Sequence, residues 1–260
     1  MRLDVYLVKN NLAGGRDAAK RLIEEGKVFV NGKPAVKAGI DVEAAEVELR
    51  GEPLRYVSRG GLKLEKAINT FNIVLKGKTA LDIGAYAGGF TDCMLQNGAV
   101  KVYAVDVGHG QLSPKLTADP RVINLEGTDA RSLTLDEKAD FASVDVAFIS
   151  LELVLPRVFE LLKDGGELAA LIKPQFEAGR ENVGKKGVVK DKAVHKQVVE
   201  RIADFASKLG FEVKGLDHSP IKGPEGNIEY LMYAVKGAAS ELSNEIRESI
   251  GSLIERSHIS

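Results

Sequence analysis

Cysteine and long apolar runs are scarce in this sequence, and each shortage excludes a class of protein. One cysteine among 260 residues rules out a disulfide framework and a Cys-rich zinc site, and it is typical of a reducing compartment. No uncharged stretch approaches the roughly 18–20 residues that a membrane helix needs. The start of the chain carries Arg2 and Asp4 where a secretory signal would need an apolar run. We therefore expect a cytoplasmic protein.

The sequence also lacks an excess of charge of either sign, and this balance hides a pattern. It holds 36 Lys and Arg against 37 Asp and Glu, a formal net charge of −1, which by itself argues against nucleic-acid binding. The charge is segregated, however. Residues 1–40, 50–66 and 171–192 carry +4, +3 and +3, which leaves −11 for the other 181 residues. We expect these three basic segments to meet on one face around Lys173.

The first 50 residues predict a small α+β unit. Apolar residues at helical spacing and short alternating runs give its elements, which are helices over 3–7 and 18–23, a strand over 28–30 and an edge strand over 47–49. Asn31-Gly32 is typical of a type I′ hairpin turn, with Val36 on the returning strand.

From about residue 78 the pattern becomes that of a doubly wound α/β domain. Short apolar runs recur, and most of the intervals between them have room for a helix, as in βαβ units around a buried parallel sheet. The runs fall at 79–83, 102–105, 122–123, 141–144 and 168–172. A helix is expected at about 191–209, followed by closing strands over 211–216 and 229–235. The last 24 residues predict an amphipathic helix that either contacts another subunit or caps the sheet.

Residues able to hold a ligand follow the ends of the predicted strands, where ligands of a doubly wound fold bind. The first strand runs into a glycine-rich loop over 84–90, whose spacing differs from the dinucleotide-binding G-x-G-x-x-G. Asp106 stands where an acid binds a ribose diol, and Asp129 stands where an acid can accept from an adenine amino group. Asp145 ends the fourth strand. Each acid alone fits a helix cap or a loop, but three at successive strand ends favour a ligand site.

Six motifs in order give a specific resemblance. They are RYVSRGGLKL at 55–64, LDIGAYAGGFTDCMLQ at 81–96, YAVDVGHGQL at 103–112, DVAFISL at 145–151, IKPQFEAGR at 172–180 and GPEGNIEYL at 223–231. Together they resemble the TlyA family of ribosomal RNA ribose 2′-O-methyltransferases, whose members are also called hemolysins. Residues 2–33 are similar to an S4 RNA-binding domain. The resemblance covers nearly the whole chain to about residue 236.

The resemblance implies a domain order, a cofactor and a substrate. An α+β S4-like domain over 1–50 and a linker over 51–62 precede a Rossmann-like methyltransferase domain over 63–237 and a C-terminal helix over 238–260. The implied methyl donor is S-adenosyl-L-methionine. The implied acceptor is a ribose of ribosomal RNA, with cytidine expected, so that ribosomal subunits are the expected partners.

The related FtsJ-type ribose methyltransferases imply a catalytic set of Lys63, Asp145, Lys173 and Glu229. Lys173 is expected nearest to the 2′-oxygen, as a neutral base or as an ammonium that stabilises the alkoxide, and the sequence leaves both roles open. The competing interpretation of the four residues is two surface ion pairs. Cofactor contacts are expected from Asp82, Gly84, Ala85, Tyr86, Gly88, Gly89, Phe90, Asp106, Val107, Asp129, Ala130 and Asp145.

RNA contacts are expected from each basic segment. The S4 resemblance assigns them to Arg2, Arg16 and Lys37, with Lys20 and Arg21 on the same helix as further candidates. Outside that domain the candidates are Arg59 in the linker and, in a glycine-containing loop after the fifth strand, Arg180, Lys185 and Lys186. That loop either orders on RNA or is merely solvated. Phe148 and Phe176 either stack on a base or belong to the core.

Three departures from the family pattern and three other functions are weighed against this interpretation. Tyr86-Ala87 replaces Ser-Thr and Ala147 replaces Ser near the cofactor, and Gly15 replaces the usual Ser of the S4 pattern. The alternatives are a membrane-active hemolysin, a catalytically silent RNA-binding protein and, least favoured, an NAD-dependent dehydrogenase. The four histidines lack metal-ligand spacing and Cys93 lies on an apolar helix face, so that we expect neither a metal site nor a cysteine nucleophile.

Overall fold

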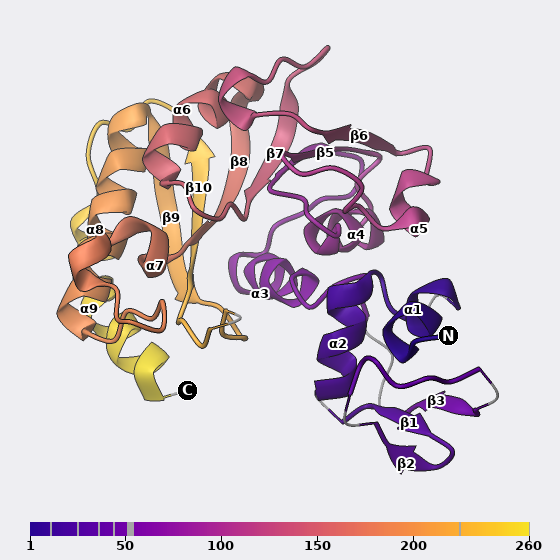
Figure 1. Ribbon diagram of the computed structural model, residues 1–260. Coiled ribbons are helices and arrows are strands. Elements are labelled where there is room, and N and C mark those ends of the chain that lie inside the picture. The colour runs from indigo at the N-terminus through magenta and orange to yellow at the C-terminus, as the bar shows by residue number, and fades with distance from the viewer. Residues whose placement is uncertain are drawn as a thin grey trace.

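Two sheets organise the structure, a small one near the N-terminus and a large one in the rest of the chain (Figure 1). The structure is a computed structural model that describes residues 1–10, 12–24, 26–35, 37–43, 45–50, 55–223 and 225–259, without the side chains of residues 21 and 24. Three sequence-based expectations therefore lie outside the described residues. They concern Val36 of the hairpin, residues 51–54 of the linker and the side chain of Arg21.

The N-terminal module packs two helices on a three-stranded antiparallel sheet of order β2-β1-β3. Its elements are α1 (Leu3–Lys9), α2 (Arg16–Glu24), β1 (Val28–Val30), β2 (Lys33–Pro34) and β3 (Val47–Leu49). Asn31 and Gly32 join β1 to β2 with φ of 50° and 75°, the left-handed pair that a type I′ turn requires. The predicted hairpin and edge strand are therefore confirmed.

The large sheet has the order β6-β5-β4-β7-β8-β10-β9, so that the strand order reverses between β4 and β7. All neighbours pair in parallel except β10, which runs antiparallel between β8 and β9. The strands are β4 (Thr79–Ile83), β5 (Lys101–Asp106), β6 (Val122–Glu126), β7 (Ala139–Val144), β8 (Leu162–Ile172), β9 (Phe211–His218) and β10 (Tyr230–Lys236). This is the predicted doubly wound sheet.

Helices cover both faces of the large sheet because the inner strands are apolar on both sides. On one face, α3 (Gly61–Phe71) and α4 (Gly89–Gln96) pack with alternate strand residues such as Ala80 and Ala104. On the other face, α6 (Leu151–Leu161) and α8 (Lys192–Leu209) pack with residues such as Leu81. Short helices occupy connections: α5 (Pro114–Thr117), η1 (Ala130–Ser132), α7 (Pro174–Glu177) and η2 (Arg180–Asn182).

The C-terminal helix α9 (Asn244–Ile259) caps the sheet rather than standing free. It packs on α8 and β9, and Ile250, Leu253 and Ile254 belong to the same core cluster as α6 and α8. A buried network fixes its last turn, because the Tyr230 hydroxyl lies 2.7 Å from His195 Nδ1 and 3.1 Å from Ser257 Oγ. Of the two predicted roles for this helix, the structure supports the cap.

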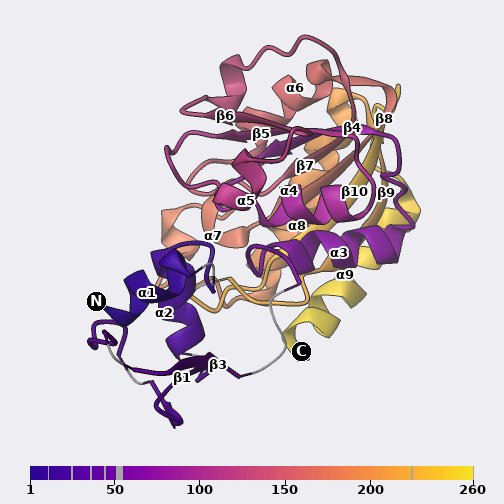
Figure 2. The ribbon, with the colours of Figure 1, turned by 90° about the vertical axis from the view of Figure 1, so that its right-hand side faces the viewer.

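The N-terminal module lies on the side of the large domain where the parallel strands end. Figures 1 and 2 both show α1 and α2 near α3 and on the same side as α7 and the loop between β9 and β10. This side of the molecule therefore receives the first, second and third basic segments.

Candidate active site

A cavity of about 520 Å³ opens at the carboxyl ends of β4, β5 and β7, where the strand order reverses. Its volume falls within the range of about 300–1,000 Å³ that small-molecule sites occupy. The glycine-rich loop after β4, the ends of β5 and β7, and the start of α3 line it. The predicted cofactor residues on its wall are Gly84, Ala85, Tyr86, Gly89, Phe90, Asp106, Val107, Asp129, Ala130 and Asp145.

The glycine-rich loop passes very close to the end of β7. Gly84 has a φ of +85°, and a Cβ on it would lie 2.5 Å from the backbone oxygen of Asp145, so that only glycine fits. Tyr86 also adopts a left-handed conformation, with a φ of 47°, and its N–H donates to Asp106 Oδ2 over 2.8 Å. The close approach brings the loop and Asp145 to the same wall of the cavity.

Asp106 and Asp129 both line the cavity, but their carboxylates have different hydrogen-bond partners. Asp106 Oδ2 accepts from Tyr86 and Oδ1 from the Gly108 N–H over 2.8 Å, which fixes the carboxylate at the end of β5 where a ribose diol would bind. Arg131 holds both oxygens of Asp129, with contacts down to 2.6 Å, and its side-chain hydrogen bonds lower the pKa of Asp129 to about 2. An adenine amino group would therefore share the Asp129 carboxylate with Arg131.

Two residues predicted to contact the cofactor lie off the cavity wall. Asp82 is buried inside the domain, where its oxygens accept from the hydroxyls of Thr91 over 2.6 Å and Ser143 over 2.8 Å. Burial raises the pKa of Asp82 to about 6, against the hydrogen bonds from Thr91 and Ser143. Gly88 packs against Leu116 and Leu112. Both residues therefore support the glycine-rich loop from inside the domain and do not line the cavity.

The four predicted catalytic side chains meet in one cluster although they come from distant parts of the chain. Lys63 Nζ in α3 lies 2.6 Å from Glu229 Oε2 and 3.8 Å from Asp145 Oδ2, and Lys173 Nζ lies 2.5 Å from Asp145 Oδ1. Each of the four side chains is at most 18% exposed. They do not form surface ion pairs, which was the competing interpretation.

The electrostatics of the cluster follow from its pairing. Burial pushes the pKa of Asp145 upward, but the nearby ammonium groups of Lys63 and Lys173 outweigh burial and lower it. Two carboxylates thus face two ammonium groups in a space largely closed to water. Such a set can hold a hydroxyl group in a fixed place and stabilise charge that develops on its oxygen.

Residues that the sequence did not single out complete the cluster. Gln175 Nε2 donates to Glu229 Oε1 over 3.2 Å, and a Cβ on Gly223 would lie 2.8 Å from the same oxygen. The buried Asn227 accepts from the Val189 N–H and donates to the Gly187 oxygen, which ties the basic loop to the segment before β10. Their only sequence signal was their place inside the motifs at 172–180 and 223–231.

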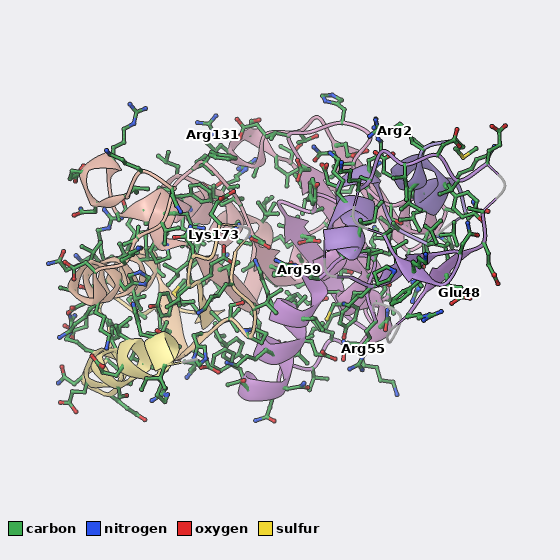
Figure 3. The ribbon with its side chains drawn as sticks, turned by 60° about the horizontal axis from the view of Figure 1, so that its bottom comes forward. Arg2, Glu48, Arg55, Arg59, Arg131 and Lys173 are labelled. Carbon is green, nitrogen blue, oxygen red and sulfur yellow. The ribbon has the colours of Figure 1, made fainter. Side chains whose placement is uncertain are left out.

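Two of the predicted RNA-binding residues, Arg2 and Arg59, can be placed on the side that carries the cavity. Figure 3 looks onto that side, and its labels include members of all three basic segments, Arg2, Arg59 and Lys173. Arg59 lines the cavity and donates to the Lys222 oxygen over 3.4 Å. The side chains of the remaining described candidates are exposed, namely Arg16, Lys20, Lys37, Arg180, Lys185 and Lys186.

Phe148 and Phe176 form a pair beside the cluster. Their ring centroids lie 4.9 Å apart at an interplanar angle of 51°, and Lys173 Nζ lies 5.8 Å from the centre of the Phe176 ring. Phe148 is 91% exposed, so that it does not belong to the core. Cys93, in contrast, is buried inside α4, as expected for a packing residue.

The described part of the chain contains neither a metal-binding cluster nor a helix that could cross a membrane. There, no group of three His, Cys, Asp or Glu side chains is arranged to hold a metal ion. Within the same residues, none of the helices has both the length and the apolar character that a membrane crossing requires.

Comparisons with known proteins agree on both parts of the chain. The family model described as FtsJ-like methyltransferase matches residues 56–236, and the S4 domain model matches residues 1–47. "Putative rRNA methyltransferase YqxC" of Bacillus subtilis is 47% identical, over 99% of this chain and 94% of that protein. "16S/23S rRNA (cytidine-2'-O)-methyltransferase TlyA" of Mycobacterium tuberculosis is 42% identical, over 89% of this chain and 88% of that protein. A solved structure named "Putative hemolysin from Streptococcus thermophilus" aligns with a TM-score of 0.81 at 46% identity, covering 100% of this chain and 96% of that one.

Proposed function

The chain belongs to the FtsJ-like methyltransferases, and within them to the TlyA proteins, which carry an N-terminal S4 domain. We therefore propose that it methylates ribose 2′-hydroxyls of ribosomal RNA. The observation that carries the proposal is the buried cluster of Lys63, Asp145, Lys173 and Glu229 at the wall of the cavity. A ribose hydroxyl is a weak nucleophile, and these residues supply what it needs, a fixed position and stabilisation of the developing oxyanion.

The cavity fits S-adenosyl-L-methionine, which supplies an activated methyl group when bound. Its size suits the ligand, Asp106 stands where a ribose diol binds, and Gly84 brings the backbone against the cavity. Asp129 and Ala130 line the adenine end of the proposed site. Asp82 and Gly88 support the loop without lining the cavity.

Lys173 is the proposed catalytic residue at the ribose oxygen. In the reaction the 2′-oxygen forms a bond to the methyl carbon, the bond from that carbon to sulfur breaks with its electron pair left on sulfur, and the hydroxyl proton passes to solvent. Asp145 holds Lys173 at 2.5 Å, and Glu229 with Gln175 holds Lys63 in place. We assign to Lys173 the stabilisation of the developing alkoxide, because Asp145 holds its Nζ atom at the wall of the cavity.

The acceptor is proposed to be a cytidine in ribosomal RNA, since the M. tuberculosis relative is named for that reaction on 16S and 23S rRNA. The S4 domain and the exposed basic residues of the three segments support an RNA partner. We place the protein with ribosomal subunits in the cytoplasm. The domain boundaries at 50, 62 and 237 belong to this proposal, supported by the start of α3 at Gly61 and the end of β10 at Lys236.

A Lys173→Ala variant tests the proposed function. We expect transfer of labelled methyl from the cofactor to isolated ribosomal subunits to fall by at least about a hundredfold, because the alkoxide loses its partner. Cofactor binding by isothermal titration should stay near the wild-type value, since Asp106 and the glycine-rich loop are untouched. Lys138→Ala is the matched control, because Lys138 is exposed and precedes β7 at the opposite edge of the sheet. Turnover by Lys173→Ala at the wild-type rate would refute the assignment, and binding without any transfer by the wild-type protein would indicate a silent RNA-binding protein.

A further inference from the structure

A buried carboxylate joins two of the predicted RNA-binding arginines in the N-terminal module. Asp4 lies in the first turn of α1, and its side chain has no exposed surface. Arg2 donates to it from Nε over 3.0 Å and from Nη2 over 3.1 Å. Arg16, at the start of α2, donates from Nη2 over 3.0 Å and from Nε over 3.3 Å. One carboxylate therefore fixes two guanidinium groups from two helix starts.

Arg2 and Arg16 bind Asp4 through the same edge of the guanidinium group. Both bind Asp4 through Nε and Nη2, so that the Nη1 side of each planar group points away from the carboxylate. Both arginine side chains are more than half exposed, at 54% and 59%. A guanidinium can hold a carboxylate on one edge and a phosphate on the other, whereas a lysine ammonium offers no second flat edge.

The two arginines favour the charged form of the Asp4 carboxylate. The hydrogen bonds and charges of Arg2 and Arg16 outweigh burial and hold the pKa of Asp4 well below its usual range. Its Oδ1 also accepts from the Val5 N–H over 3.0 Å, so that the carboxylate has five donors. Without Asp4 the two guanidinium groups would repel each other, and each would lose its fixed orientation.

We propose that Asp4 is a positioning residue that sets Arg2 and Arg16 as a preassembled clamp for the phosphate groups of RNA. The inference rests on the proposed function, because that function supplies the RNA. Fixing both side chains before RNA arrives lowers the conformational entropy that binding would otherwise cost. The clamp carries two positive charges and one negative charge, and more than half of each arginine side chain is exposed to solvent.

Removal of the negative charge separates positioning from simple electrostatics. By charge alone, Asp4→Asn makes the module more basic and should strengthen binding of a polyanion. The clamp predicts the reverse, a weakening of about tenfold, because the two guanidinium groups separate. Binding is measured with the full-length protein and a labelled ribosomal RNA transcript over a range of salt concentrations. Asp17→Asn is the matched control, because Asp17 is an exposed acid on α2 that pairs with Lys20, and its removal should leave affinity unchanged or raise it.

A double-mutant cycle shows whether Asp4 acts through the arginines. Arg2→Ala with Arg16→Ala should weaken binding and reduce the slope of log affinity against log salt by about 2. Adding Asp4→Asn to that pair should weaken binding no further, because the groups that Asp4 positions are gone. An equal loss from Asp4→Asn in both backgrounds would overturn the proposal, as would wild-type or stronger binding by the single variant.

A second variant keeps the test valid if Asp4→Asn fails to fold. Arg2→Lys preserves the charge and a contact to Asp4 but loses the two-edged geometry, so that its affinity should fall nearly as far as that of Arg2→Ala. Wild-type affinity in Arg2→Lys would overturn the proposal. Because the readout is RNA binding, an absence of methyl transfer by the wild-type protein would refute the proposed function and leave this comparison intact. An absence of salt-dependent binding by the wild-type protein would overturn both.

Discussion

Two aspartates near the cavity show how partners decide the state of a buried carboxylate. Asp82 accepts hydrogen bonds from the hydroxyl groups of Thr91 and Ser143, and burial raises its pKa to about 6. For Asp145 burial also acts to raise the pKa, but Lys63 and Lys173 outweigh it and lower the pKa. The first residue supports the loop from inside the domain, whereas the second has its charge fixed in the cluster.

The raised pKa of Asp82 predicts a pH dependence of stability. Below the unfolded pKa, near 3.8, Asp82 is protonated in the folded and the unfolded state, so that its contribution to the free energy of unfolding is fully present and does not change with pH. As pH rises toward 6, the unfolded chain loses this proton first, so that the free energy of unfolding falls by about 2–3 kcal/mol. Asp82→Asn should remove that fall, which chemical denaturation from pH 4 to pH 6.5 measures as the difference between variant and wild type.

Asp140 supplies a control with the opposite sign. Burial acts to raise its pKa, but the hydrogen bond from Lys163 and the nearby lysine charges outweigh burial and lower it. Its stabilisation is present above the unfolded pKa and is lost as pH falls through the folded pKa. The difference in unfolding free energy between the wild type and Asp140→Asn should therefore be constant above about pH 4 and shrink on the acid side of that pH. Identical profiles for Asp82→Asn and the wild type between pH 4 and 6 would contradict the prediction.

At the scale of elements, β4 is flanked by two left-handed glycines with different surroundings. Gly77 precedes the strand with a φ of +79°, and a Cβ on it would meet no atom within 4 Å. Gly84 follows the strand with a φ of +85°, and a Cβ there would lie 2.5 Å from the Asp145 oxygen. The loop after β4 can lie against the end of β7 only because this position has no side chain. A comparison of alanine substitutions at Gly77 and Gly84 therefore distinguishes the free-energy cost of a left-handed backbone conformation from the cost of a steric clash with Asp145.

Gly77→Ala and Gly84→Ala should therefore differ in both stability and cofactor affinity. Gly77→Ala should lose about 1–2 kcal/mol of unfolding free energy, the cost of a left-handed alanine. Gly84→Ala should lose about 1–3 kcal/mol more, because the loop must move away from β7. Denaturant titration measures the stability, and isothermal titration with S-adenosyl-L-methionine should show at least a tenfold weaker affinity in Gly84→Ala alone. Equal effects of the two substitutions would show that the contact with Asp145 has no role.

The sequence predicted best those strands whose residues are buried on both faces of the sheet. The apolar run 79–83 matches β4 residue for residue. Strand β8 begins at Leu162 rather than 168, because its first residues, which include Gly165 and Gly166, form an extension with little apolar signal. The antiparallel direction of β10 had no local signal, because it follows from pairing with β8 and β9.

The site was readable only where a motif carried it. The resemblance named the four members of the cluster, and the structure brings them together. The inward position of Asp82 was missed because its partners Thr91 and Ser143 are 9 and 61 residues away. The Arg131 contact with Asp129 spans two residues, and an acid followed by an arginine could have indicated it.

At the scale of the whole molecule, an almost neutral protein carries basic residues of three separate segments on one side. The three segments are opposed by −11 over the other 181 residues, of which residues 41–49 carry −4 within the N-terminal module itself. Members of all three segments appear on the side that carries the cavity. Because phosphate binding releases counterions, such a side should give RNA affinity a steep dependence on salt despite the net charge of −1.

Paired substitutions on opposite edges of the sheet test whether the placement of charge matters more than its amount. Lys185→Ala with Lys186→Ala removes two exposed charges from the loop that Asn227 ties beside Glu229. We expect the slope of log affinity against log salt for a ribosomal RNA transcript to fall by about 2, with cofactor affinity unchanged. Lys76→Ala with Lys138→Ala removes the same charge at exposed positions that precede β4 and β7, at the edge away from the cavity. That pair should leave the slope within about 0.5 of the wild type, because counterions are released only where the protein neutralises phosphates. Equal slopes for the two pairs would mean that RNA responds to total charge, and the side that carries the cavity would then have no special role.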